Sequence, residues 1–322
     1  MNDSIKAIVG IDMSKQKFDA ALLRNNKFKH KVFPNNKKGH EAMSAWLQKQ
    51  AIIAAHICME STNVYGEALA EYLTDQGYMV SIVNPARIKG FAQSELSRTK
   101  TDKADASLIA RFCLAMAPEA WTPDPQEIRE LKGLVRRLES LIEMRQQEVN
   151  RLHVAPDIVV SGLKEHIDYL DQEIKTTKER IRDHIDNHPD LKKKKTLLES
   201  IPGIGEATIN VVLSEFANIE NFKTAKQLAA FIGVAPKERQ SGSSVRGRTT
   251  MSKTGRSQLR KSFFMPALVA LRYNPILVQM KERLLEAGKS KMAIVGAAMR
   301  KLVHLIYGVL KSGQPFDANY AK

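Results

Sequence analysis

The sequence predicts a chain of the α/β plus α class, in which an α/β domain is followed by mainly helical domains. Three observations favour this class. Residues 1–120 alternate short apolar runs with amphipathic stretches, residues 125–188 carry two heptad-like runs, and residues 191–322 are basic and helical in pattern. The 322 residues, 43% of them hydrophobic, are enough for more than one packed core. We therefore expect domains over residues 1–124, 125–190 and 191–322.

The first of these regions begins with a predicted antiparallel meander. Strands are expected over residues 7–12, 17–24 and 28–33, with a turn at Asn25-Asn26. The elements expected next are a helix over 37–50, a strand ending at Glu60, a helix over 63–76, a strand over 78–83 and a helix over 101–116. Three hairpin strands followed by strand–helix repeats are the order of a ribonuclease H-like domain.

Four acidic residues stand at the ends of these elements. Asp12 follows the apolar run 7–11, and Glu60 ends the run 56–59. Asp102 and Asp105 are three residues apart at the start of a helix, so both carboxylates lie on one helix face. In a ribonuclease H-like domain the first strand, a central strand and a late helix converge at one edge. The four carboxylates therefore predict a site for a hard cation such as Mg²⁺, which prefers oxygen ligands.

Each acid also has a purely structural interpretation. Asp12 or Glu60 alone could form hydrogen bonds at a strand end, and Asp102 could be the N-cap of its helix. Asp19 and Glu67 have no comparable placement and are expected to be surface residues. The joint placement of the four acids favours the metal site over the separate structural roles.

The middle region has the pattern of two long helices. Apolar positions alternate at spacings of three and four, and Pro156-Asp157 interrupts the pattern between the two runs. The positions are Ile128, Leu131, Val135, Leu138, Ile142, Arg145, Val149 and Leu152, then Leu163, Ile167, Leu170, Ile174, Thr177, Ile181 and His184. We expect an antiparallel coiled-coil hairpin, or a pair recruiting partner helices, used for dimerisation or bridging. The alternative is a helical subdomain packed onto the core.

The net charge of +15 is confined to the C-terminal part of the chain. Residues 1–190 hold 27 basic and 27 acidic residues, whereas residues 191–322 hold 23 basic and 8 acidic ones. Such a concentration indicates a face that binds nucleic-acid phosphates. The alternative is a solvated surface that only aids solubility.

Targeting and redox signals predict a soluble cytoplasmic protein. There is no secretory pattern at Met1 and no apolar run near 18 residues. Cys58 and Cys113 are widely spaced and lack a C-x-x-C partner, so we expect buried free thiols and no zinc site.

Two motifs of the basic region suggest phosphate chemistry. Gly203 and Gly205 lie in a P-G-I-G turn between two predicted helices, the pattern of a helix-hairpin-helix, and its alternative is a structural turn. Residues 239–261 hold seven basic residues and no acidic one, around a flexible serine stretch that begins at Ser241. The basic residues expected to bind nucleic acid there include Arg239, Arg246, Arg248, Lys253 and Arg256.

This serine segment has three interpretations. It could be a cradle in which arginines bind phosphate oxygens. A serine could instead attack a scissile phosphate while the arginines stabilise the developing charge. The third interpretation is a disordered loop that grips the nucleic-acid backbone without specificity.

The motifs together resemble those of the DEDD-type insertion-sequence transposases, relatives of the pilin-gene invertases. The resemblance covers nearly the whole chain in the right order. It is carried by G-I-D-M-S-K at 10–15, E-S-T-N-V-Y at 60–65, T-K-T-D-K-A-D-A at 99–106, the P-G-I-G turn, and S-G-S-S-V-R-G at 241–247.

The resemblance implies a RuvC-like domain, a coiled-coil insertion and a C-terminal transposase domain. It implies that Asp12, Glu60, Asp102 and Asp105 bind Mg²⁺ and that Ser241 becomes covalently linked to DNA. It further implies target and donor DNA as partners, a structured noncoding bridge RNA as guide, and dimers that form tetramers on DNA. In these assemblies the acidic tetrad of one protomer faces the serine of another.

The function expected from all of this is DNA strand transfer by a transposase. One rival is a RuvC-like nuclease or junction resolvase, in which a metal-activated water attacks and the serine segment only binds. Another is a nonenzymatic scaffold that binds nucleic acid. The intact set of four acids speaks against the scaffold.

Overall fold

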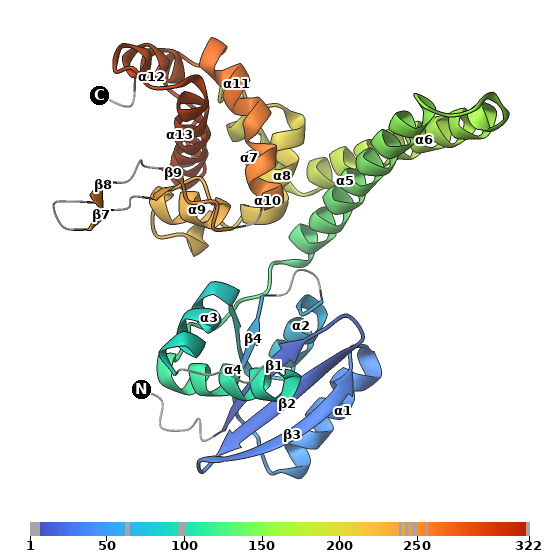
Figure 1. The fold of residues 1–322 in the computed structure, drawn as a ribbon, viewed down its shortest axis with the longest axis vertical. Coiled ribbons are helices and arrows are strands. Elements are labelled where there is room, and N and C mark those ends of the chain that lie inside the picture. Colours follow the sequence, from blue (N-terminus) through green and yellow to red (C-terminus); the bar gives the residue numbers. More distant parts are fainter. Residues whose placement is uncertain are drawn as a thin grey trace. The chain divides into compact units, whose positions relative to one another are not determined.

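The chain is described in a computed structural model over residues 7–61, 65–95, 101–237, 240–241, 245–246, 250–255 and 257–319 (Figure 1). It divides into two compact units, Met1–Pro123 and Asp124–Lys322. We call these the first unit and the second unit.

The first unit is built on a five-stranded mixed sheet. Its strands are β1 (Ile8–Met13), β2 (Lys17–Arg24), β3 (Lys27–Pro34), β4 (His56–Glu60) and β5 (Met79–Val83), in the spatial order β3-β2-β1-β4-β5. The strands β1, β2 and β3 are antiparallel, and β4 and β5 continue the sheet parallel to β1. The predicted meander is present. Asn25 and Asn26 adopt positive φ angles of 49° and 61°, as a two-residue hairpin turn requires.

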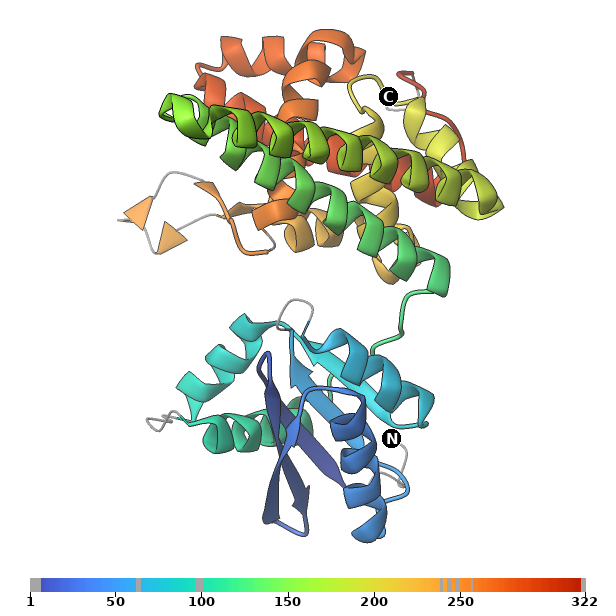
Figure 2. The ribbon, with the colours of Figure 1, turned by 90° about the vertical axis from the view of Figure 1, so that its right-hand side faces the viewer.

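Helices cover both faces of this sheet (Figure 2). The helices α1 (Lys37–Lys49) and α2 (Glu67–Asp75) share one core cluster with the side chains of Val9 and Ile11 of β1. The helices α3 (Pro85–Ser94) and α4 (Asp102–Met116) share another with Ile8 of β1. Alternate side chains of β1 therefore pack against the helices on opposite faces of the sheet. Helix α3 was not predicted, because only Ile88 of its residues is buried and its apolar pattern is weak.

Helix α4 lies directly on β1 at Gly10. A Cβ atom at Gly10 would lie 2.1 Å from the carbonyl oxygen of Ala106 and 2.3 Å from the backbone nitrogen of Ala110. Only a glycine allows backbone to approach backbone this closely. This contact holds α4 against the strand that carries Asp12.

We expect Gly10→Ala to lower the free energy of unfolding of the first unit by about 2–4 kcal/mol, because a backbone clash cannot be relieved by a rotamer change. The matched control is Gly90→Ala on α3, where a Cβ has nothing within 4 Å. That change should stabilise by about 0.5–1 kcal/mol through helix propensity. Urea unfolding followed by circular dichroism measures both, and equal effects of the two changes would contradict the close-approach argument.

The second unit begins with a helical hairpin of α5 (Gln126–Leu152) and α6 (Asp157–Asn187). The helices run antiparallel, because Arg145 Nε donates to Asp171 Oδ1 at 2.5 Å near one end and His184 Nε2 contacts the Glu127 carbonyl at 2.7 Å near the other. Its buried residues join the core of the following helices in one cluster. The hairpin is thus packed onto the second unit.

The predicted heptad positions of α5 coincide with its buried residues only as far as Leu138. Ile142 is 46% exposed, whereas its neighbour Leu141 is fully buried. Further along α5, Glu148 is buried and Val149 is only partly buried. After Leu138 the buried stripe moves by one residue toward the N-terminus, from position 142 to 141 and from 149 to 148.

The rest of the second unit is a helical bundle with two small strand pairs. The helices are α7 (Pro189–Glu199), α8 (Glu206–Phe216), η1 (Ile219–Asn221), α9 (Ala225–Ile232), α10 (Ser257–Ser262), α11 (Phe264–Tyr273), α12 (Pro275–Glu286) and α13 (Lys291–Ser312). The strands are β6 (Pro236–Lys237), β7 (Gln240–Ser241), β8 (Val245–Arg246) and β9 (Thr250–Met251). The sequence predicted one loop where these strand pairs lie.

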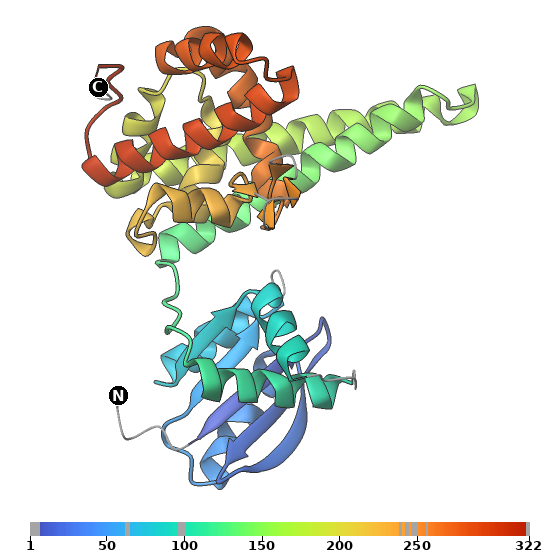
Figure 3. The ribbon, with the colours of Figure 1, turned by 60° about the vertical axis from the view of Figure 1, so that its left-hand side comes forward.

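Helix α13 is the central helix of this bundle. It packs against α7, α9, α11 and α12 (Figure 3). Among the described residues it is the one helix long and apolar enough to cross a membrane, and half of its most apolar window is buried. Its apolar residues Leu302, Val303 and Ile306 are fully buried in the core of the second unit.

The two cysteines are buried free thiols, as predicted. Cys58 lies on β4 and Cys113 on α4, between the sheet and the helix layer. The hydrogen bond with Cys58, followed by burial, raises the pKa of the Cys113 thiol far above its ordinary value, so it stays protonated.

Candidate functional site

The four predicted acids lie at one edge of the first unit. Glu60 is the last residue of β4, and Asp12 is the last but one of the neighbouring parallel strand β1. Helix α4 begins at Asp102, and its contact with Gly10 holds the helix on β1. The carboxyl ends of two parallel strands and the first turn of one helix therefore supply the four carboxylates.

The N-cap of α4 is Thr101 and not Asp102. Thr101 Oγ1 accepts a hydrogen bond from the backbone nitrogen of Ala104 at 3.2 Å. The structural role considered for Asp102 is thus filled by its neighbour. Asp102 and Asp105 stand in the first turn of the helix, where its N–H groups and dipole favour negative charge.

The electrostatics of the site show that the four carboxylates act on one another. Burial and then the charges of Asp105, Asp102, Glu60 and Asp19, in that order of size, together raise the pKa of Asp12 to about 6. Burial also raises the pKa of Glu60, and the charge of Asp105 adds to this effect. Half-buried acids that oppose each other's ionisation are typical of functional sites.

A fifth acid, Asp19, belongs to the same cluster, and its prediction as an ordinary surface residue was wrong. It lies directly opposite Asp12 in the register of β1 and β2, so both side chains share one face of the sheet. Its side chain is only 14% exposed. The signal that could have found it is the hairpin register.

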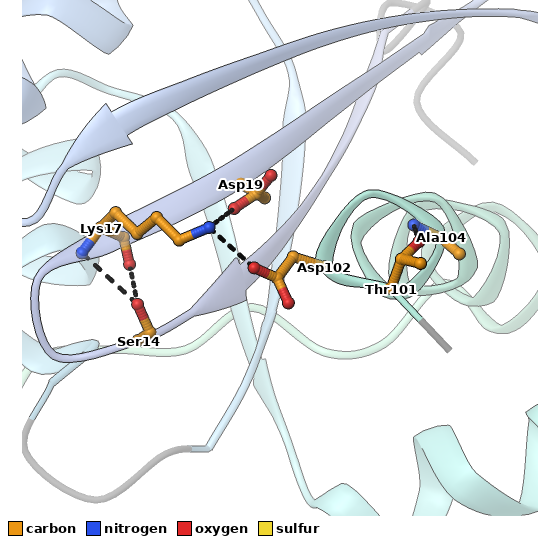
Figure 4. Close-up of polar contacts among 6 residues, drawn as sticks. All are labelled: Ser14, Lys17, Asp19, Thr101, Asp102 and Ala104. Atoms are coloured by element: carbon orange, nitrogen blue, oxygen red, sulfur yellow. Dashed lines mark hydrogen bonds and ion pairs between the residues drawn. The ribbon is translucent and has the colours of Figure 1, made fainter. Parts of the chain in front are cut away.

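Lys17 is the cation of this cluster, and sequence reasoning missed it. Its Nζ atom donates to Asp102 Oδ2 at 2.8 Å and lies 3.5 Å from Asp19 Oδ2 (Figure 4). The hydrogen bond with Lys17 lowers the pKa of Asp102, and the same bond raises the pKa of Lys17. Ser14 orders the preceding turn, since its hydroxyl donates to the Lys17 carbonyl at 2.7 Å.

The chemistry of the donor set suits Mg²⁺. All the predicted ligands are carboxylates, which this hard cation prefers. Burial and the neighbouring negative charges raise the pKa of Asp12, and a bound cation would favour its ionised form. Over the described parts of the chain, no three His, Cys, Asp or Glu side chains are already gathered as a metal-ligand set. The ion pair with Lys17 engages Asp102 instead.

Ser241 lies in the second unit, on one of the small strand pairs. It pairs with Val245, and Gln240 pairs with Arg246. A second strand pair flanks the first in the sequence. In it, Pro236 pairs with Met251 and Lys237 pairs with Thr250. These pairings give the serine segment a defined backbone at Ser241. Arg239, Arg248 and Arg256 of the predicted basic set lie outside the described residues.

Lys253, two residues after the end of β9, lines a groove of about 780 Å³. Its backbone has a positive φ of 54°, and its carbonyl accepts from Arg260 Nη1 at 3.3 Å. The groove is also lined by Arg260, Lys261, the acid Glu139, and Met251, Met265, Met292, Gly296 and Met299. It therefore holds several methionine side chains, three cationic residues and one carboxyl group.

The two glycines of the P-G-I-G turn have different surroundings. Gly203 has a φ of +99°, and a Cβ there would lie 2.6 Å from the Cβ of Ala270, so this glycine allows the turn to pack on α11. The buried Asn274 supports the same turn by donating to the Pro202 carbonyl at 3.2 Å. Gly205 is exposed at the start of α8 and has nothing within 4 Å of an added Cβ. Phosphate contact at Gly205 stays a prediction.

Comparisons with known proteins agree with one another. One family model, described as a transposase of the DEDD and IS110 type, matches residues 9–158. A second, described as the transposase IS116/IS110/IS902 family, matches residues 195–281. The chain is 33% identical to the pilin gene-inverting protein of Moraxella bovis, over 97% of this chain and 98% of that protein. The pilin gene-inverting protein of Moraxella lacunata matches to the same extent.

More distant similarities are also found. The transposase for insertion sequence element IS1328 of Yersinia enterocolitica is 20% identical over 60% of this chain and 64% of that protein. Among solved structures, Thermus thermophilus RuvC in complex with a Holliday junction substrate matches 35% of this chain and 98% of its own, at 14% identity and a TM-score of 0.28.

The fold, the acidic cluster and these matches define a transposase, an enzyme that recombines DNA. Both family models match in order along the chain, and the similarity to the inverting proteins extends over nearly its full length. The chain belongs to the IS116/IS110/IS902 family of transposases.

Proposed function

We propose that this transposase cleaves and exchanges the DNA strands of a mobile element with two sets of residues. The first is a Mg²⁺-binding tetrad of Asp12, Glu60, Asp102 and Asp105 in a first unit of RuvC-like, ribonuclease H-like type. The second is the nucleophile Ser241. The observation that carries the proposal is the mutual electrostatic effect of the four carboxylates at the edge where β1, β4 and α4 meet.

The carboxylates of the tetrad would hold the metal through their oxygens. When bound, Mg²⁺ supplies Lewis-acid stabilisation of the charge on a scissile phosphate. Asp12 and Glu60 are held by β1 and β4 of the sheet, and Asp102 and Asp105 by the first turn of α4. Because β1, β4 and α4 are packed together, the backbone that carries the four carboxylates is held in place.

The serine step forms one bond and breaks one. The Ser241 oxygen attacks the phosphorus, the bond from phosphorus to the 3′-oxygen breaks, and the serine proton leaves to solvent or to a base. The products are a phosphoserine diester and a free 3′-hydroxyl. A 3′-hydroxyl of another strand then attacks the phosphoserine and releases the serine, so the bond energy is conserved without ATP. Arg246 and Arg248, which follow Ser241 in the sequence, are proposed to stabilise the developing charge.

Partners follow from the charge distribution and from the family resemblance. The basic surplus of residues 191–322 suits target and donor DNA, and Gly205, Arg239, Lys253 and Arg256 are proposed contacts. A structured bridge RNA as guide, and dimers that assemble into tetramers through the α5–α6 hairpin, are proposed on the resemblance. Such an enzyme works in the cytoplasm, where its DNA lies.

Lys17 should compete with the metal for Asp102, because one ammonium group already neutralises that carboxylate. We expect Lys17→Met to increase the affinity for Mn²⁺, used as a spectroscopic substitute for Mg²⁺, by roughly three- to tenfold. Mn²⁺ binding is measured by electron paramagnetic resonance on the full chain without DNA. The control is Lys15→Met, an exposed lysine of the same turn, which should change the affinity less. Equal affinities for both variants would contradict the competition.

The proposed function is tested by the chemistry of the product. A plasmid carrying the gene with its native flanking DNA is incubated with the purified protein, Mg²⁺ and RNA transcribed from the flanks. Strand exchange through Ser241 predicts DNA ends attached to protein on denaturing gels, and recombinant junctions by sequencing. Hydrolysed ends without attached protein would instead show a RuvC-like nuclease that uses water.

A further inference from the structure

Two nitrogen atoms on α13 are shielded from solvent and have no hydrogen-bond partner among the described residues. They are Nε of Arg300 and Nε2 of His304. The two residues are four apart on one helix, so their side chains are neighbours on one face, with Cα atoms about 6 Å apart along the axis. Buried polar atoms without a partner are rare in folded proteins, and each calls for a ligand or another explanation.

The surroundings of these atoms are cationic. Helix α9 packs against α13 and brings Lys226 to this face. Burial lowers the pKa of the His304 imidazole, and the charges of Arg300, Lys301 and Lys226 lower it further. Glu220, an acid of the neighbouring turn, forms an ion pair with Lys311, two helical turns beyond His304. Among the described residues, the charges that act on His304 are those of Arg300, Lys301 and Lys226, and all three are positive.

The helix face of α13 that carries Arg300 and His304 also carries Gly296, which lines the groove near the serine segment. Gly296, four residues before Arg300, lines the groove together with Lys253. A Cβ at Gly296 would lie 3.2 Å from the Met251 side chain, and Met251 ends the outer strand pair of the serine segment. Gly296, Arg300 and His304 thus form one line along α13, and this line begins beside the strands that lead to Ser241.

We propose that Arg300, His304 and Lys226 form a phosphate subsite that binds one phosphodiester of a nucleic-acid backbone. Arg300 donates from its guanidinium group, and the His304 ring supplies a second donor from the same helix face. Lys226, exposed on α9, supplies further positive charge from the neighbouring helix. The subsite rests on the proposed function, because a strand that passes Ser241 would follow the groove to this point. It binds phosphate and does no chemistry.

The test measures how salt weakens nucleic-acid binding by the full chain. Fluorescence anisotropy follows labelled duplex DNA and labelled single-stranded RNA across a salt series. The double variant Arg300→Gln/Lys226→Gln should reduce the slope of log affinity against log salt by up to about 1.8 for DNA or about 1.4 for RNA, if both cations contact phosphate. The matched control is Arg283→Gln/Lys281→Gln on α12, which removes the same charge from another face of the same unit.

The outcomes separate the alternatives. A smaller slope on one probe alone supports the subsite and identifies that nucleic acid as its ligand, and a smaller slope on both supports a shared phosphate contact. Equal losses for the double variant and its control would overturn the subsite while leaving the proposed function intact. A wild-type chain that binds neither probe would overturn the proposed function itself. If Arg300→Gln fails to fold, Lys226→Gln alone and His304→Gln repeat the test.

Discussion

Asp12→Asn is expected to abolish strand exchange while making the first unit more stable. The substitution keeps the shape of the side chain but removes the charge that we propose holds Mg²⁺ at the end of β1. We expect recombination to fall by roughly 10³-fold or more, because metal stabilisation of a phosphoryl transition state is worth several kcal/mol. Sequencing of recombinant junctions from the plasmid with native flanking DNA measures the loss.

The gain in stability follows from the raised pKa of Asp12. This pKa is about 6 in the folded chain, against an ordinary value of 3.8. The folded state thus holds the proton more tightly, so stability is fully present below pH 3.8 and is lost as the pH rises through 6. At pH 7.5 in EDTA, Asp12→Asn should stabilise the first unit by about 1 kcal/mol, after a discount for partial exposure. Near pH 4 the gain should disappear.

The matched control is Asp75→Asn, an exposed acid at the end of α2. It should change neither recombination nor thermal stability by more than about 0.5 kcal/mol. A variant at Asp12 that loses both activity and stability would indicate a structural role for this residue. Loss of activity together with a higher melting temperature is the signature of a functional site.

Ser241→Ala is expected to eliminate the covalent adduct between protein and DNA. Removing the proposed nucleophile would leave only slow attack by water, so strand exchange should fall by on the order of 10⁴-fold or more. Denaturing gels of labelled DNA measure the adduct directly. Binding of duplex DNA should persist, since the hydroxyl group contributes little to phosphate affinity compared with the basic residues.

Ser243→Ala provides the control within the same segment. It removes an equivalent hydroxyl group from the same serine stretch of the sequence and should leave the adduct in place. Persistence of the adduct in the Ser241 variant, with its loss in the Ser243 variant, would move the nucleophile by two residues. Persistence in both would remove the serine mechanism and favour a metal-activated water.

Much of the first unit was predictable from local patterns. The apolar runs located the five strands, and Asn25-Asn26 predicted its turn because asparagine tolerates positive φ. Helix α3 escaped prediction because one buried residue does not make a periodic pattern. The strand pairs near Ser241 escaped it as well, since two-residue strands are too short to show an alternation of side chains.

The residues of the candidate site also fall into two groups, those indicated by local sequence patterns and those that depend on tertiary contacts. Asp12, Glu60, Asp102 and Asp105 were predictable because each follows or begins an element of recognisable type. Asp19 and Lys17 were not, because their part in the site depends on pairing across a hairpin and on an ion pair between residues 85 positions apart. Residues whose roles come from contacts distant in sequence leave no periodic signal.

The sequence by itself determined the class of this protein. The order of its strands, the four acids, the basic C-terminal part and the serine motif predicted a DNA transposase, and the matches over both parts of the chain agree with that class. Only the tertiary structure decided the state of the site. The Gly10 contact brings α4 onto β1, burial raises the pKa of Asp12, and Lys17 pairs with Asp102. The physical reason is that burial and ion pairing are properties of side chains packed together in space.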